Sequence, residues 1–214
     1  MKTLLVVLRT LLQLGLPVLG WGGFAPFFSH LPLVALTIVT LLMSAIVLFS
    51  SANISSGVRE ERGNRWVLGA FIILAVLLAY VPAYTDRHDV WTIGGEAVRW
   101  TGVVLFILGG TLRLWPVWVL GRFFSGLVAI QRDHKLITTG IYGRIRNPSY
   151  LGMLVGALGW ALAFRSALGI LITALLLIPL SARMQAEEQL LAGQFGPEYA
   201  SYKARSWRLL PGIY

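Results

Sequence analysis

Residues 31–50 read LPLVALTIVTLLMSAIVLFS and contain no charged side chain. A helix of about 20 apolar residues is about 30 Å long, which matches the hydrocarbon thickness of a bilayer. The whole chain agrees with a membrane location, because 57% of its 214 residues are hydrophobic and only 13% are charged, against about 25% charged in soluble domains. The sequence therefore predicts an integral membrane protein.

Five further apolar segments predict membrane helices around this one. They comprise residues 3–22, 66–84, 96–118, 149–164 and 167–182. Arg9 and Arg113 interrupt two of these segments, and long basic side chains of this kind can extend to the membrane surface. The last two segments are separated by only a few residues around Arg165, which predicts a helical hairpin with short, tilted arms. We expect an all-α polytopic membrane protein with about six membrane helices.

The polar end of the chain, from residue 183 onward, predicts an amphipathic helix over 183–193. A Phe-Gly-Pro break at 195–197 and a short helix over 198–206 are expected to follow. Neither an internal repeat nor a low-complexity tract divides the sequence, so we expect a single domain spanning residues 1–214.

Charge gives the orientation. Lysines and arginines concentrate in the 51–65 loop, in residues 119–148 and in the C-terminal tail, whereas the connections near 23–30 and 85–95 hold only Arg87. The positive-inside rule places the basic segments and both termini in the cytoplasm. The net charge of +9 does not indicate nucleic-acid binding, because no basic face with interleaved aromatics is present. The chain has no cysteine, which excludes disulfides and thiolate metal sites, and we expect no metal site of another kind.

One polar segment, HKLITTGIYGRIRNPSYLG at residues 134–152, stands beside the hairpin. Asn147 precedes Pro148 and is therefore expected to be extended, so that Pro148 opens the first arm at its first turn. The simpler interpretation is a surface loop whose arginines reach lipid phosphates.

A second polar group follows the hairpin's second arm. Arg183 and Glu187 are four residues apart and can pair on one helical face. Glu188 points about 100° away from Glu187, so Arg183 cannot neutralise both carboxylates. Because the hairpin returns to the side where it began, Arg146 and Glu188 are expected at the same end, where they suggest a polar pocket.

The two segments together resemble the C-terminal signature of the isoprenylcysteine carboxyl methyltransferase family, which is related to the phospholipid N-methyltransferases. The first motif is matched by His134, Leu136, Thr138, Gly140, Tyr142, Arg146, Pro148, Tyr150 and Gly152. The second is matched by Arg183, Glu187, Glu188, Leu191, Phe195, Gly196, Tyr199, Tyr202, Arg208 and Pro211. The resemblance covers residues 112–214 and leaves the membrane helices of 1–111 without an assigned role. Asn147 replaces the histidine that the family carries before the proline.

This resemblance implies an enzyme that uses S-adenosylmethionine at a cytoplasmic pocket and methylates a lipid or lipidated acceptor, either a carboxylate or a phospholipid amine. The implied cofactor-binding residues are His134, Lys135, Leu136, Gly140, Tyr142, Asn147, Pro148, Tyr150, Glu187 and Glu188. Either glutamate is expected to accept the cofactor's ammonium group. The implied catalytic residues are Arg146, Asn147 and Glu187, with Arg146 free to orient an anionic head group. An amine or thiol acceptor would also need a base, for which His134 or a glutamate is the candidate.

Two alternatives stay open on the sequence. Membrane sterol reductases share a similar C-terminal pattern and use NADPH. A non-catalytic transporter subunit or scaffold is the other possibility, and its mark would be a charged or broken helix near the bilayer midplane.

Overall fold

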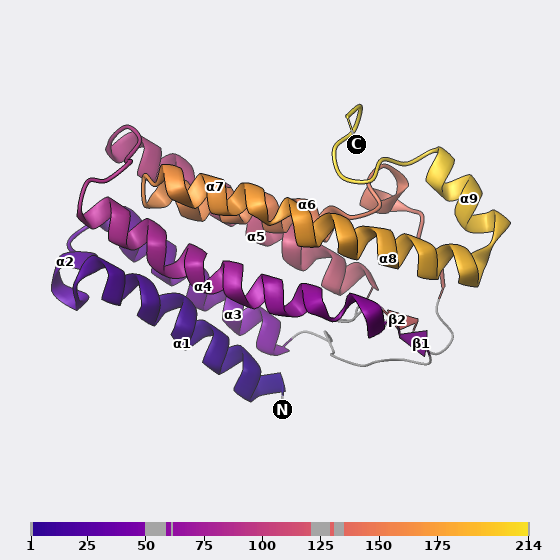
Figure 1. Cartoon of the computed structure of the whole chain (residues 1–214), viewed down its shortest axis with the longest axis horizontal. Helices are drawn as coiled ribbons and strands as arrows, with labels where there is room; N and C mark the ends of the chain where they lie inside the picture. Colours follow the sequence, from indigo (N-terminus) through magenta and orange to yellow (C-terminus); the bar gives the residue numbers. More distant parts are fainter. Residues whose placement is uncertain (1, 50–58, 61, 121–128, 131–134, 214) are drawn as a thin grey trace.

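The computed structural model describes residues 2–49, 59–60, 62–120, 129–130 and 135–213, and this part of the chain is almost entirely helical (Figure 1). The helices are α1 (Lys2–Trp21), α2 (Phe24–Phe28), α3 (Leu31–Phe49), α4 (Trp66–Arg87), α5 (Glu96–Leu120), α6 (Pro148–Ala163), α7 (Ala167–Leu175), α8 (Leu177–Phe195) and α9 (Pro197–Ala204). In the described ranges, 3-10 turns occupy Arg62–Asn64 and Gly140–Gly143, and β1 (Arg59–Glu60) pairs antiparallel with β2 (Ala129–Ile130).

The described helices include five that are long and apolar enough to cross a membrane, which makes the protein an integral, multi-pass membrane protein. They are α1, α3, α4, α5 and the combined run Ala167–Phe195. α6 is also apolar but has only 16 residues. The predicted all-α class is therefore confirmed, and α6 and α7 form the predicted hairpin around a turn at Arg165.

The predicted helix over 183–193 is present, but it does not begin at residue 183, because these residues belong to the longer α8. α7 and α8 follow each other with only Leu176 between them, so the second arm of the hairpin continues directly into the polar region. Leu, Ala, Met, Gln and Glu dominate residues 182–192, and all of them favour a helix. The helix therefore continues past the apolar boundary, and it ends where Gly196 takes a positive φ of 51° before Pro197.

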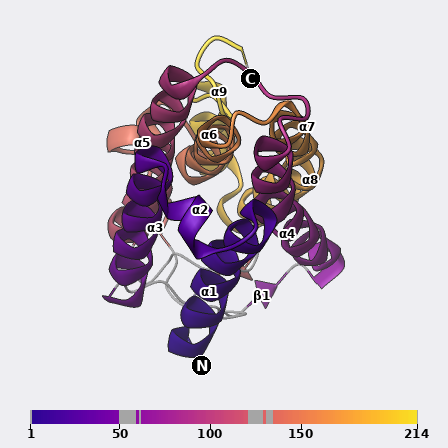
Figure 2. The ribbon, with the colours of Figure 1, turned by 90° about the vertical axis from the view of Figure 1, so that its left-hand side faces the viewer.

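The membrane helices surround a central space. In Figure 2 α3 and α5 lie on one side, α4, α7 and α8 on the other, and α6 and α1 lie between the two sides. Helix contacts link α1 to α3 and α4, α3 to α5, α5 to α6, and α4 to α7 and α8. The N-terminal helices therefore form part of the same ring as the hairpin.

α5 and α6 are the most closely packed pair, and glycines allow their backbones to touch. A Cβ atom on Gly109 would overlap the backbone of Gly156, and one on Gly152 would overlap the backbone nitrogen of Arg113. Small residues at a membrane helix interface allow this close approach. As a result, Arg113 is held directly against the first turn of α6.

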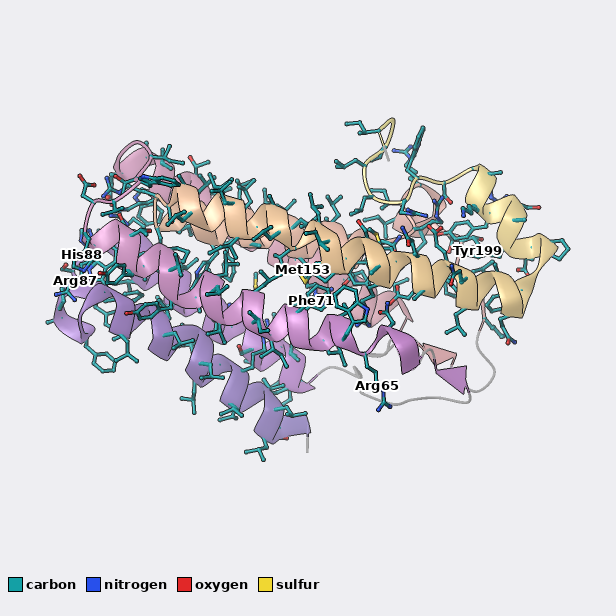
Figure 3. The ribbon with its side chains drawn as sticks, viewed as in Figure 1. Arg65, Phe71, Arg87, His88, Met153 and Tyr199 are labelled. Carbon is teal, nitrogen blue, oxygen red and sulfur yellow. The ribbon has the colours of Figure 1, made fainter. Side chains whose placement is uncertain are left out.

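The two ends of the bundle differ in charge. One end carries α2 and the connection near Arg87 and His88, and the other carries α9 and the start of α4 near Arg65 (Figures 1 and 3). At the first end the buried Asp86 forms ion pairs with Arg99 and Arg165. The basic C-terminal tail lies at the second end.

Candidate active site

A cavity of about 950 Å³ lies inside the ring of helices and reaches the end that carries α9. Its wall comes from α1, α3, α4, α5, α6, α8 and α9, and from residues of the segment before α6. Figure 3 labels Phe71 on α4 and Met153 on α6, two of the side chains that line its apolar part. Polar and charged side chains gather at the end next to the polar segment.

Most of the site residues expected from the sequence line this one cavity. They are Lys135, Leu136, Tyr142, Arg146, Asn147, Pro148, Tyr150, Glu187 and Glu188. Gly140 does not line it; it is exposed and begins a 3-10 turn with a φ of +60°. His134 lies outside the described residues.

The polar segment enters α6 through Asn147 and Pro148. Asn147 takes non-helical angles, φ −125° and ψ 57°, in place of the fully extended conformation expected before proline. Pro148 occupies the first turn of α6, as the sequence predicts. The side-chain amide of Asn147 donates to the carbonyl of Arg208 at 3.0 Å, so it bonds to the C-terminal tail.

Backbone hydrogen bonds join the same segment to the tail. The amide of Arg146 donates to the Trp207 carbonyl at 2.8 Å, and the Trp207 amide donates to the Arg144 carbonyl at 2.8 Å. Tyr202 of α9 adds a hydroxyl that donates to the Tyr142 carbonyl at 2.8 Å. Burial raises the pKa of Tyr202 to about 12, so this hydroxyl stays protonated at neutral pH and keeps its donor. The tail therefore forms part of the structure of the site.

Glu188 is the centre of a group of ion pairs. Its carboxylate lies 3.3 Å from Nε of Arg146, 2.8 Å from Nη2 of Arg208 and 3.1 Å from Nζ of Lys203. Arg146 also donates from Nη1 to the carbonyl and hydroxyl of Ser206 and, at 3.1 Å, to the carbonyl of Lys203. Nε and Nη1 of Arg146 are thus bonded to Glu188 and the tail in this structure, and its expected role in orienting a head group stays a prediction.

Glu187 belongs to a second polar group deeper in the cavity. Arg183 donates from Nε to Glu187 Oε1 at 3.1 Å, as the four-residue spacing predicts, and to the Tyr150 hydroxyl at 2.6 Å. The Tyr150 hydroxyl in turn donates to Glu187 Oε1. The Glu187 side chain is 27% exposed, against 8% for Glu188. Of the two carboxylates, Glu187 therefore has the more accessible surface toward a bound molecule.

Two arginines of the cavity were not assigned a role in the site from the sequence. Arg113 of α5 donates to the hydroxyl of Ser149 at 2.9 Å, and its guanidinium lies 5.9 Å from the centre of the Tyr150 ring. Arg9 of α1 lines the same cavity. The available signal was an arginine inside an apolar span, which generally marks a functional position. Its weakness is that an arginine near a helix end can equally extend to the membrane surface.

These features define a class of protein: an all-α membrane bundle with a cavity that is apolar in one part and charged where two signature segments meet. Residues 97–198 match the sequence model of the phospholipid methyltransferase family. The isoprenylcysteine O-methyltransferase B of Arabidopsis thaliana is 34% identical over 181 residues, covering 78% of this chain and 89% of that protein. The chain belongs to the isoprenylcysteine O-methyltransferase family, and on that ground it is a membrane methyltransferase.

Other relatives agree with this family. The Dictyostelium discoideum protein-S-isoprenylcysteine O-methyltransferase is 26% identical over 144 residues, which cover 66% of this chain and 61% of that protein. A solved structure of a eukaryotic intramembrane Ras methyltransferase superposes with a TM-score of 0.52 at 19% identity, covering 99% of this chain and 85% of that one. That superposition shows a shared fold. It extends over the N-terminal helices, which the sequence motifs do not reach.

Proposed function

We propose that this protein transfers a methyl group from S-adenosylmethionine to the carboxylate of an isoprenylated cysteine held in the membrane. The main support for the proposal is that the cavity has an apolar part and a charged end. Its apolar walls suit a prenyl tail, and its charged end combines Glu187 with Arg113, an arginine that forms no ion pair among the described residues. The names of the relatives in the same family support this acceptor.

The residues at the charged end fit the cofactor. The Glu187 carboxylate is the more accessible acceptor for its ammonium group, and Lys135, Leu136, Tyr142 and Pro148 provide the surrounding wall. S-adenosylmethionine supplies a methyl group that its sulfonium already activates. The protein therefore has to orient the acceptor and exclude water, which are the two effects that an enclosed apolar cavity provides.

A carboxylate acceptor agrees with the protonation chemistry of the site. A carboxylate is already nucleophilic and needs no base, whereas an ammonium acceptor has to lose a proton first. Glu187 and Glu188 are both paired with arginine, and the amide of Asn147 cannot take up a proton. In this proposal Arg113 orients the carboxylate, because a guanidinium offers two parallel donors to its two oxygens.

We further propose that the charged end of the cavity faces the cytoplasm. The described basic residues of the tail, Lys203, Arg205 and Arg208, lie at that end, together with Arg65 at the start of α4. Cytoplasmic loops carry an excess of lysine and arginine.

Methyl transfer from radiolabelled S-adenosylmethionine tests the proposal. The purified protein is given N-acetyl-S-farnesylcysteine in one assay and phosphatidylethanolamine vesicles in another. We expect label in the farnesylated product, released by mild alkali as methanol, because an ester is cleaved by base and an N-methyl group is not. Alkali-stable label in the phospholipid, with none in the cysteine derivative, would instead establish an amine methyltransferase.

A further inference from the structure

The N-terminal helices form one wall of the cavity. The lining side chains of α1 are spaced three and four residues apart, which places them on one face of the helix. They are Leu5, Leu8, Arg9, Leu12, Gln13 and Leu16. On α3 the lining residues follow the same spacing: Thr40, Met43, Ser44 and Val47. The hydroxyl of Thr10 donates to that of Ser44 at 2.8 Å and joins the two helices beside Arg9.

Arg9 is the only charged residue of α1 after Lys2. It lies within the apolar part of the helix, yet no hydrogen bond or ion pair joins it to another residue of the described chain. An ionised side chain at such a depth is costly unless a partner compensates it. Arg9 is also close enough to Arg113 for their positive charges to repel each other.

The charges on the cavity wall do not balance. The charged side chains that line it are Arg9, Arg113, Lys135, Arg146, Arg183, Glu187 and Glu188. Glu188 is paired with Arg146 and Glu187 with Arg183. Among the described residues, Arg9 and Arg113 are therefore the two arginines of the wall that form no ion pair, although Glu187 is close enough to Arg113 to attract it. Two like charges facing one apolar space favour the binding of an anion between them.

We propose that Arg9 is a second anion-binding residue of the acceptor site, which holds the acceptor's carboxylate together with Arg113. The inference rests on the proposed function and deepens it, because it gives the N-terminal helices a part in acceptor selection. A carboxylate has two oxygens and about four lone-pair sites, enough for donors from two guanidinium groups. Arg113 approaches from α5 beside the polar segment, and Arg9 approaches from α1, on another wall of the cavity. Arg9 therefore distinguishes an anionic acceptor from a neutral molecule with the same tail.

The test compares Arg9→Gln and Arg9→Lys with the wild-type protein. Arg205→Gln is the matched control, because it removes the same charge from an exposed position just after α9. Two probes share one farnesyl tail: N-acetyl-S-farnesylcysteine as the acceptor, and its carboxamide as an uncharged competitive inhibitor. Binding of S-adenosylhomocysteine, measured by calorimetry, reports whether the cofactor pocket is intact.

We expect Arg9→Gln to raise KM for the acid about tenfold, the effect of losing a hydrogen bond to a charged group. The inhibition constant of the carboxamide and the affinity for S-adenosylhomocysteine should stay unchanged. Arg9→Lys should restore part of the acid's affinity, and Arg205→Gln should match wild type.

Three results would overturn the inference. Equal weakening of the acid and the carboxamide would mean that Arg9 only packs against the tail. Unchanged KM would mean that Arg9 reaches the membrane surface. The third result is that Arg9→Gln leaves KM for the acid unchanged and only alters how strongly added phosphatidylglycerol vesicles inhibit methylation. Arg9 would then bind a lipid head group and not the acceptor.

Failure of the proposed function gives a different result, namely a wild-type protein that binds S-adenosylhomocysteine but does not methylate the acid. In that case, direct calorimetry of the acid and the carboxamide still tests Arg9. Selective loss of acid binding in Arg9→Gln supports the anion site, and equal binding by wild type and variant contradicts it.

Discussion

Arg146 and Glu188 lie 42 residues apart in the chain, yet Nε of Arg146 is 3.3 Å from Oε1 of Glu188 and both side chains are more than nine-tenths buried. The hairpin of α6 and α7–α8 brings them together, because it returns the chain to the end where α6 begins. The tail then surrounds the pair with Ser206 and Arg208. The ion pair between Arg146 and Glu188 therefore joins the two signature segments, residues 134–152 and the segment that begins at Arg183.

This geometry predicts that Arg146→Lys weakens cofactor binding and lowers thermal stability together. Arg146 uses two nitrogens, Nε toward Glu188 and Nη1 toward the tail, whereas the three donors of a lysine lie on a single nitrogen and cannot reproduce this separation. Each charged hydrogen bond lost costs about 1.5–3 kcal/mol. Calorimetry with S-adenosylhomocysteine and thermal unfolding in detergent measure the two effects. If Arg146→Lys lowers turnover but leaves the cofactor affinity and the unfolding temperature unchanged, this prediction is contradicted. Arg146 would then act on the acceptor.

Glu187 is expected to act on the cofactor more directly than Glu188. Replacing it by glutamine keeps the shape of the side chain and an oxygen for Arg183 and Tyr150, but it removes the negative charge that attracts an ammonium group. We therefore expect Glu187→Gln to weaken S-adenosylhomocysteine binding by about tenfold or more. The exposed Glu198→Gln in α9 is the control. Unaltered affinity with a lower unfolding temperature would show that Glu187 serves only to hold Arg183.

The sequence predicted the parts of this structure that depend on local rules. Long apolar segments gave the membrane helices, Pro148 marked the start of α6, and the spacing of Arg183 and Glu187 gave their ion pair. Each of these depends on residues within a few turns of each other. The prediction that Arg146 and Glu188 lie at the same end needed a further inference. The short break between the two apolar segments indicates a hairpin, and a hairpin returns the chain to the end where it began.

What the sequence did not predict depends on contacts between distant backbones. Arg146 and Asn147 bond to carbonyls of the tail, and a carbonyl has no residue-specific signal in a sequence. Arg113 reaches Ser149 only because α5 and α6 approach closely at their glycines. The direct succession of α7 and α8 was missed because the polarity of residues 183–193 was taken as the start of a new helix.

The close approach of α5 and α6 can be tested by adding one methyl group. In Gly152→Ala the new Cβ would overlap the backbone of Arg113 and Gly109, so the helices have to separate. Overpacking of this kind typically costs about 1–3 kcal/mol. Gly69→Ala on α4 is the matched control, because no atom lies within 4 Å of its new Cβ.

Thermal unfolding in detergent should show a loss for Gly152→Ala and none for Gly69→Ala, since alanine is the better helix former. Because Arg113 moves with α5, KM for the carboxylate acceptor should rise in Gly152→Ala as well. Equal stability of the two variants would show that the two helices do not depend on this contact.

The unequal charge of the two ends of the bundle gives a prediction for the orientation of the protein in the membrane. At the end with α2, Arg87, Arg99 and Arg165 are balanced by Asp86, Asp89 and Glu96. At the end with α9, the tail residues Lys203, Arg205 and Arg208 outnumber Glu198. This difference predicts that α9 lies in the cytoplasm.

Because the chain has no native cysteine, single-cysteine variants report each end without background. Gly95→Cys lies at the end with α2, where no atom is within 4 Å of the new Cβ, and Ser201→Cys is exposed on α9. We expect a membrane-impermeant maleimide to label Gly95→Cys in intact cells, and Ser201→Cys only after the membrane is permeabilised. Labelling of Ser201→Cys in intact cells would place the charged end of the cavity outside. The cofactor, which is made in the cytoplasm, could then not reach Glu187, so this single result would contradict both the orientation and the proposed use of the pocket.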